Sequence, residues 1–138
     1  MIVRCEGCGS ANRVPAARMR DVARCGRCKT AVSPLHKPLA IHSVAELDEL
    51  VAHSPVPVLV DFWAQWCGPC LAVAPQLEQV ADRKAGEAVI AKVDTEEIPE
   101  LAERFGIRAI PTMIVFAEGR EKKRMTGAMP ADAIERGL

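Results

Sequence analysis

Two cysteines, Cys67 and Cys70, are separated by two residues and stand shortly after a mostly apolar run at residues 56–63. A run of this kind is typical of a strand buried in a parallel sheet, and Pro69 suits the first turn of a helix, where its missing N–H is not needed. The pattern therefore predicts a strand that passes directly into a helix whose first turn carries both thiols. The unpaired N–H groups and positive dipole end of such a turn stabilise a thiolate, the species that attacks disulfides.

This placement predicts reversible thiol–disulfide exchange. We expect Cys67, at the exposed start of the helix, to be the attacking nucleophile, and Cys70 to resolve the mixed disulfide that results. Gly68 permits the tight turn between them, and Trp66 offers an apolar surface to a partner. A structural disulfide and half of a metal site are the alternatives, and both are disfavoured because the other four cysteines form a set of their own.

Those other cysteines form two C-x2-C pairs separated by sixteen residues, a spacing within the range of zinc ribbons. Four thiolates complete the tetrahedral coordination of zinc, so we predict one structural zinc ion, with two disulfides or free thiols as the alternatives. A segment this small cannot hold a large core, and the metal should supply much of its folding free energy. His36 is expected to be a linker residue rather than a ligand. The predicted ligands are Cys5, Cys8, Cys25 and Cys28.

Charge divides the chain in two. Residues 1–38 hold eight basic and two acidic side chains, whereas residues 39–138 hold ten basic and sixteen acidic ones, although the net charge of the whole chain is zero. Together with the two prolines near residue 36, this asymmetry predicts a zinc-ribbon-like N-terminal module at residues 1–33, a linker at residues 34–38 and a larger C-terminal module at residues 39–138.

The length and the start of the chain indicate its compartment. The 138 residues are enough for one ordinary domain and a small appendage. No apolar run is long enough to span a membrane, and the chain starts without the apolar segment of a signal peptide. We therefore expect a cytoplasmic protein, because in a reducing compartment paired cysteines more often bind metal or act in catalysis than form structural disulfides.

Apolar periodicity predicts that strands and helices alternate in the C-terminal module. Ser43 and Glu46 form a capping-box pattern, which predicts a helix that begins there. The order is β-α-β followed by β-β-α. The predicted strands lie at residues 39–41, 57–62, 88–93, 112–117 and 122–126, and the later helices at residues 67–85, 97–105 and 130–138.

The stretch at residues 61–70 resembles the thioredoxin family closely, and a four-cysteine module joined to such a domain is similar to the thioredoxin 2 type. The resemblance implies an α/β thioredoxin fold, a central mixed β-sheet flanked by helices, with a small N-terminal zinc-ribbon-like domain. It implies a protein-disulfide reductase that acts on cytosolic proteins, is re-reduced by an NADPH-dependent thioredoxin reductase, binds no organic cofactor and is a monomer. Neither nucleic acid nor a membrane is expected as a partner.

The resemblance also implies roles for single residues. Asp61 matches the aspartate that assists proton transfer with the second cysteine, and Lys92 matches the lysine near that aspartate. Burial of Asp61 in the apolar run should raise its pKa. Ile110 and Pro111 match the cis-proline loop, which pairs with an extended substrate segment. Leu71 departs from the family, which usually has Lys or Arg there. The expected substrate-binding residues are Trp66, Gly68, Pro69, Ile110, Pro111, Gly127 and Ala128.

Plainer interpretations of these residues remain open on the sequence alone. Asp61 could be a solvated residue at a strand end, Pro111 an ordinary proline at the start of a strand, and Gly127 a bulge. For the whole chain, the alternatives are a zinc-linked redox sensor and a zinc ribbon that binds nucleic acid or protein. An oxidant or isomerase is disfavoured because Gly68 and Pro69, the residues between the cysteines, include no histidine.

Overall fold

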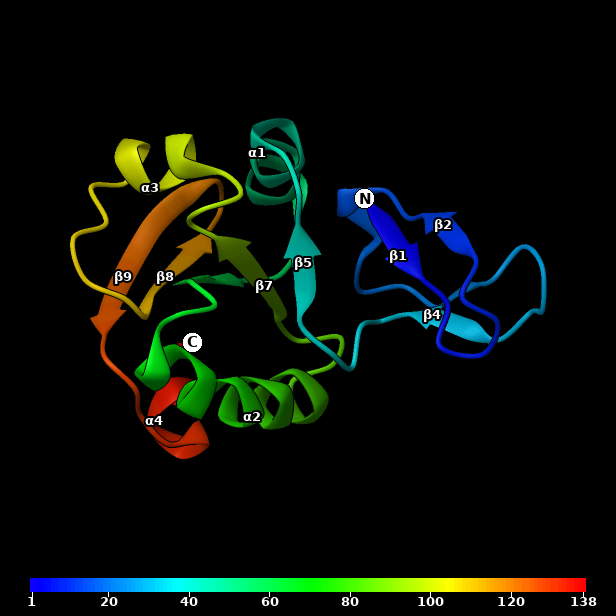
Figure 1. Ribbon diagram of the computed structural model, residues 1–138. Helices are drawn as coiled ribbons and strands as arrows, with labels where there is room; N and C mark the ends of the chain where they lie inside the picture. The colour runs from blue at the N-terminus through cyan, green and yellow to red at the C-terminus, as the bar shows by residue number, and fades with distance from the viewer.

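The computed structural model describes residues 1–138 (Figure 1). The N-terminal module contains two antiparallel two-stranded sheets, one of β1 and β2 and one of β3 and β4, with a short 3-10 helix, η1, between them. Each C-x2-C pair lies in the turn that joins the two strands of one sheet. The elements are β1 (Ile2–Arg4), β2 (Ala11–Arg13), η1 (Ala16–Arg18), β3 (Ala23–Arg24) and β4 (Ala31–Ser33).

The C-terminal module is a five-stranded mixed sheet in the order β5-β7-β6-β8-β9, with helices on both faces. The strands β5, β6 and β7 are mutually parallel, and β8 and β9 form a hairpin whose first strand, β8, runs antiparallel to β6. The elements are β5 (Leu39–Ile41), α1 (Val44–His53), β6 (Val58–Trp63), α2 (Gly68–Arg83), β7 (Val89–Asp94), α3 (Pro99–Arg104), β8 (Thr112–Ala117), β9 (Arg120–Thr126) and α4 (Ala131–Glu135). None of the helices is both long and apolar enough to cross a membrane.

The central strand β6 is apolar on both faces, which is why the sequence shows a continuous run rather than an alternation. Val58, Val60 and Phe62 pack into the core beneath α1 and α3. Leu59 packs into a second core beneath α2 and α4. Because side chains alternate along a strand, Asp61 lies on the same face of β6 as Leu59, the face covered by α2.

Most of the predicted elements are confirmed, with shifts at their ends. The helix α2 ends at Arg83, two residues earlier than expected, and β9 begins at Arg120 rather than at residue 122. The Ser43 side chain accepts from the Glu46 N–H as predicted, but the Glu46 carboxylate accepts from the N–H of His42 rather than from that of Ser43. The β8–β9 turn is built from Glu118 and Gly119, both at positive φ, a pair of angles that favours glycine and suits a hairpin.

The N-terminal module does not have a core of its own. Its buried apolar side chains belong to the same continuous cluster as the core beneath α1 and α3 of the C-terminal module, in which Ala16 and Met19 join Leu47 and Leu50 of α1. Figure 1 shows the module against the α1 and β5 side of the larger sheet. The sequence analysis predicted that metal would supply much of this module's folding free energy, but docking against α1 contributes as well.

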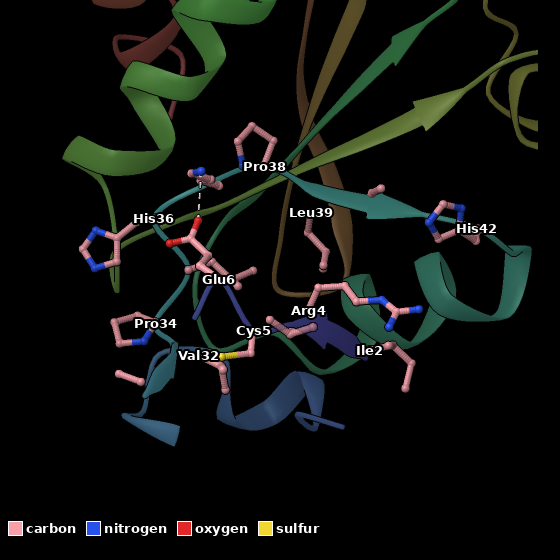
Figure 2. A pocket seen from close by; sticks show the side chains of 15 residues that line it. Ile2, Arg4, Cys5, Glu6, Val32, Pro34, His36, Pro38, Leu39 and His42 are labelled. Carbon is pink, nitrogen blue, oxygen red and sulfur yellow. Dashed lines mark ion pairs between the residues drawn. The ribbon is translucent and has the colours of Figure 1, made fainter. Parts of the chain in front are cut away.

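The two modules also border a groove next to this contact. A groove of about 480 Å³ lies between β1 and β5, lined by apolar residues such as Val32 and Leu39 (Figure 2). An ion pair spans one end of it, with Lys37 Nζ of the linker 3.0 Å from Oε1 of Glu6 in the first cysteine turn. The linker is thereby tied back to the N-terminal module.

The shared core predicts that both modules unfold together. Replacing the fully buried Met19 with Ala should lower the free energy of unfolding by about 2–5 kcal/mol. Chemical denaturation followed by tryptophan fluorescence tests this, because both tryptophans, Trp63 and Trp66, lie in the C-terminal module. The control is Val22→Ala at an exposed position, with a change within about 0.5 kcal/mol. An unchanged tryptophan transition in Met19→Ala would show that the modules unfold separately.

Candidate active site and metal centre

Cys67 and Cys70 form a disulfide at the amino end of α2, with their Cα atoms 5.2 Å apart. Cys67 is the N-cap residue of the helix, and Pro69 occupies its first turn. The Cys70 N–H donates to Cys67 Sγ over 3.2 Å, so one of the unpaired donors of the helix start is directed at this sulfur. When the pair is reduced, the same donor stabilises a thiolate at Cys67.

The sequence predicts an exposed position for Cys67 at the helix start, and that prediction is wrong. Cys67 retains only 4% of its accessible surface, because it packs with Ala64, Trp63 and Ile110. Its sulfur lies 3.7 Å from the carbonyl oxygen of Ile110, at the start of a loop whose Ile110–Pro111 bond is cis, as expected.

Gly127 joins the loop from the end of β9. Its N–H donates to the carbonyl oxygen of Pro111 over 2.9 Å, and its φ of 95° is one that glycine adopts most easily. The structure thus brings together Cys67, Ile110, Pro111 and Gly127. Ala128 follows as an exposed residue outside the apolar cluster that surrounds the disulfide.

An exposed apolar rim borders the disulfide on its other side. Trp66 is 70% exposed and Leu71 is 55% exposed, while Gly68 and Pro69 lie exposed between them. The Trp66 indole N–H donates to Oε1 of Glu96 over 2.7 Å. The sequence analysis missed Glu96, because nothing in the sequence distinguishes this glutamate from the other exposed acidic residues of the module.

Asp61 is completely buried, and neither of its carboxylate oxygens has a hydrogen-bond partner. Burial raises the pKa of this carboxyl from 3.8 to about 7, and the positive charge of Lys92 offsets part of the increase. The solvated alternative is excluded. Lys92 lies directly across from Asp61 in the β6–β7 register, but its Nζ sits 4.5 Å from the centre of the Trp63 ring rather than in an ion pair with Asp61.

The four cysteines of the N-terminal module converge on one point, with all four sulfurs within 4.8 Å of one another. Sγ of Cys5 lies 3.4 Å from that of Cys28, and Sγ of Cys8 lies 3.6 Å from that of Cys25. Each of these close pairs therefore contains one cysteine from each turn. Cys5 and Cys25 are buried, whereas Cys8 and Cys28 are exposed. Four soft sulfur donors at these separations fit a tetrahedral zinc ion.

Hydrogen-bond donors favour the thiolate at two of the four cysteines, whereas desolvation by burial and the hydrogen bond with Cys28 raise the pKa of Cys5 to about 11. The Cys28 N–H, the Asn12 side chain and the Arg27 N–H lower the pKa of Cys25 to about 6. The Thr30 hydroxyl and N–H lower the pKa of Cys28. Metal binding requires deprotonated cysteines, so this environment suits a metal centre.

The two cysteine turns are copies of one pattern, which the sequence analysis missed. Both follow Arg-Cys-x-x-Cys-x-(Ser/Thr)-Ala, at residues 4–11 and 24–31. In each copy the guanidinium of the arginine donates over 3.3 Å to a carbonyl of its own turn, Arg4 to Gly9 and Arg24 to Lys29. The spacing of twenty residues between the copies could have revealed the repeat.

Two of the three histidines pair with carboxylates rather than with the cysteines of either centre. His36 Nδ1 lies 3.0 Å from Oδ1 of Asp82, and His42 Nδ1 lies 3.0 Å from Oε2 of Glu97. His36 is therefore not among the side chains that converge with the four cysteines. The cysteine cluster and the disulfide at the start of α2 are on opposite sides of the molecule (Figure 1).

Comparison with known proteins finds a matching family model for each of the two modules. The sequence model described as Thioredoxin matches residues 38–138, and the one described as Thioredoxin 2, N-terminal, matches residues 4–30. Thioredoxin C-3 of Corynebacterium nephridii is 39% identical over 129 residues, which are 94% of this chain and 87% of that protein. The chain belongs to the thioredoxin family. Its fold is the thioredoxin fold, with a small N-terminal domain that carries the four-cysteine cluster.

Solved thioredoxin structures agree with this assignment. A point mutant of a thioredoxin from Halobacterium salinarum NRC-1 is 36% identical and superposes with a TM-score of 0.68, covering 75% of this chain and 88% of that one. A second solved chain is 25% identical and superposes with a TM-score of 0.66, covering 72% of this chain and 92% of that one. It comes from a study of thiol resolution in yeast mitochondrial 1-Cys peroxiredoxin through glutathione and thioredoxin systems. The protein is a thioredoxin-type disulfide reductase, and Cys67–Cys70 is its redox-active pair.

The buried carboxyl of Asp61 predicts a pH-dependent change in stability. Its pKa is higher in the folded state than in the unfolded chain, so the folded state binds the proton more tightly and loses stability as pH rises from about 4 to about 7. Asp61→Asn should therefore unfold with a free energy higher by on the order of 4 kcal/mol at pH 8 and nearly unchanged at pH 4. Denaturation of the oxidised protein at both pH values measures this. The control is Glu87→Gln, at an exposed acidic position. Equal stabilities of Asp61→Asn and wild type at pH 8 would contradict a raised pKa.

Proposed function

We propose that this thioredoxin reduces disulfides in cytosolic proteins and is itself re-reduced by an NADPH-dependent thioredoxin reductase. The observation that supports this most directly is the position of the Cys67–Cys70 disulfide, in the first turn of α2 and against the Ile110–Pro111 loop. The dipeptide Gly68-Pro69 between the cysteines also suits a reductase, as the family resemblance implies.

The proposed reaction uses the two cysteines in turn. In the reduced protein the Cys67 thiolate attacks one sulfur of the substrate disulfide, forms a mixed disulfide and releases the other substrate sulfur as a thiolate. Cys70 then loses its proton and attacks Cys67 Sγ. The Cys67–Cys70 disulfide forms, and the substrate leaves with both of its sulfurs reduced.

Asp61 is proposed as the group that accepts the Cys70 proton. It lies on the α2 face of β6, behind the disulfide, and a pKa of about 7 lets it exchange protons near neutral pH. Lys92 is proposed to modulate this pKa, since its charge is the one that favours the carboxylate. Its position over Trp63 supports a charge held near Asp61 without a direct ion pair.

The substrate is proposed to bind as an extended segment beside the disulfide. Main-chain groups of Ile110 at the cis-proline loop would pair with it, and this kind of pairing tolerates many substrate sequences. The exposed indole of Trp66 and the side chain of Leu71 would pack against substrate side chains. The proposed binding residues remain Trp66, Gly68, Pro69, Ile110, Pro111, Gly127 and Ala128. Thiol peroxidases are one proposed class of partner, because one similar solved chain comes from a study of a 1-Cys peroxiredoxin.

Replacing Cys70 with Ser should trap the mixed disulfide, because no thiol remains to release the substrate from Cys67. Incubation with an oxidised protein substrate, followed by non-reducing electrophoresis and mass spectrometry, should show a one-to-one adduct at Cys67. The matched control Cys67→Ser should form no adduct at this pair. A comparable yield of adduct through Cys70 in the control would reverse the proposed roles.

The metal of the N-terminal domain is proposed to be one structural zinc ion held by Cys5, Cys8, Cys25 and Cys28, with the domain at residues 1–33 and the linker at residues 34–38. Four sulfur donors leave no open position for catalysis. Metal analysis of the purified protein should therefore give one zinc ion per chain, and Cys25→Ser should lose it. Retention of one zinc in Cys25→Ser would contradict the ligand set. The control is Cys70→Ser, which should keep its zinc.

A further inference from the structure

The four cysteines of the metal centre differ in what surrounds them. A divalent ion with four thiolates carries a net charge of −2, so the sulfurs need hydrogen-bond donors that spread this charge. The buried sulfurs receive theirs from the backbone. The Gly7 N–H donates to Cys5 Sγ over 3.3 Å, and the Arg27 N–H donates to Cys25 Sγ over 3.4 Å.

The two exposed sulfurs are paired with side-chain hydroxyls instead. Cys8 Sγ lies 3.3 Å from Oγ of Ser10, and Cys28 Sγ lies 3.3 Å from Oγ1 of Thr30. With thiols the S–H group donates, but once metal replaces the proton the hydroxyl O–H becomes the donor and the thiolate the acceptor. Each of the four sulfurs thus has at least one local donor, and at Cys8 and Cys28 a side-chain hydroxyl is among them.

The fold of the repeated turn fixes the position of each hydroxyl. Gly9 and Lys29, at φ of 76° and 68°, reverse the chain directly after the second cysteine of each copy. The Cys5 N–H then donates to Ser10 O over 2.9 Å, and the Cys25 N–H to Thr30 O over 2.7 Å. The residue that bears the hydroxyl is therefore tied to the first cysteine by its backbone and faces the second with its side chain.

We propose that Ser10 and Thr30 are matched positioning residues of the metal centre, which hold the sulfurs of Cys8 and Cys28 by hydrogen bonds and determine how tightly the metal is retained. This inference rests on the proposed metal centre. Outer hydrogen bonds of this kind typically change metal affinity by about 10–100-fold, and solvent access at these exposed sulfurs places the effect near the lower limit.

The test measures metal affinity of the full chain by competition with a chromogenic chelator, using Co²⁺ and Zn²⁺. Thr30→Val keeps the shape of the side chain and removes the hydroxyl, and it should raise the dissociation constant about 10-fold. Ser10→Ala should do the same, and the double variant should lose more affinity than either single variant, although the two losses need not add because both sulfurs bind the same ion. The control is Thr126→Val on the exposed strand β9, which should bind as wild type does.

Rescue and spectroscopy separate hydrogen bonding from packing. Thr30→Ser, which keeps the hydroxyl and removes the methyl group, should bind within about twofold of wild type. Loss of the hydrogen bond should also move the sulfur-to-cobalt charge-transfer absorption of Thr30→Val to longer wavelength, because the sulfur lone pair is no longer stabilised. Saturation with one Co²⁺ per chain verifies that each variant still forms the centre.

Two outcomes would overturn the inference. One is wild-type affinity in the double variant, and the other is an equal loss of affinity in Thr30→Ser and Thr30→Val. Failure of the proposed metal centre is distinguishable from both, because in that case the wild-type chain itself would bind no Co²⁺ or Zn²⁺.

Discussion

The burial of β6 on both faces is the constraint on which the active site depends. Helices cover the strand from either side, so its direction is fixed by two apolar cores rather than one. The chain leaves the strand at Trp63 and begins α2 at Gly68, and this short connection holds the disulfide at the helix start. Precision at the sulfurs thus comes from the packing of Val58, Leu59, Val60 and Phe62 behind them.

Asp61 interrupts this packing, and the proposed mechanism gives this buried carboxyl a chemical role. A carboxyl without a hydrogen-bond partner in an apolar core is unfavourable when charged, so the fold gives up stability at this position. In the proposed mechanism this carboxyl, with a pKa raised to about 7, accepts the proton of Cys70. A nonpolar residue would pack better there, but it could not take up a proton.

The sequence predicted the parts of the fold and site that depend on local spacing. The C-x-x-C after an apolar run indicated the junction of β6 and α2, and the doubled C-x2-C indicated the four sulfurs that the structure brings together. Features that depend on contacts distant in sequence were missed. The bond from Trp66 to Glu96 and the position of Lys92 over Trp63 join residues about thirty positions apart. The docking of Met19 on α1 was hidden for the same reason.

The continuous core between the two modules has a consequence for how the protein can be dissected. The N-terminal module covers one side of α1, where Leu47 and Leu50 are fully buried, and Met19 fills part of that contact. A truncated chain that starts at residue 39 would present this apolar side to water, and exposed apolar patches of this kind promote aggregation. Loss of activity in such a fragment would therefore reflect poor solubility, and it would not show that the metal takes part in the redox chemistry on the opposite side of the molecule.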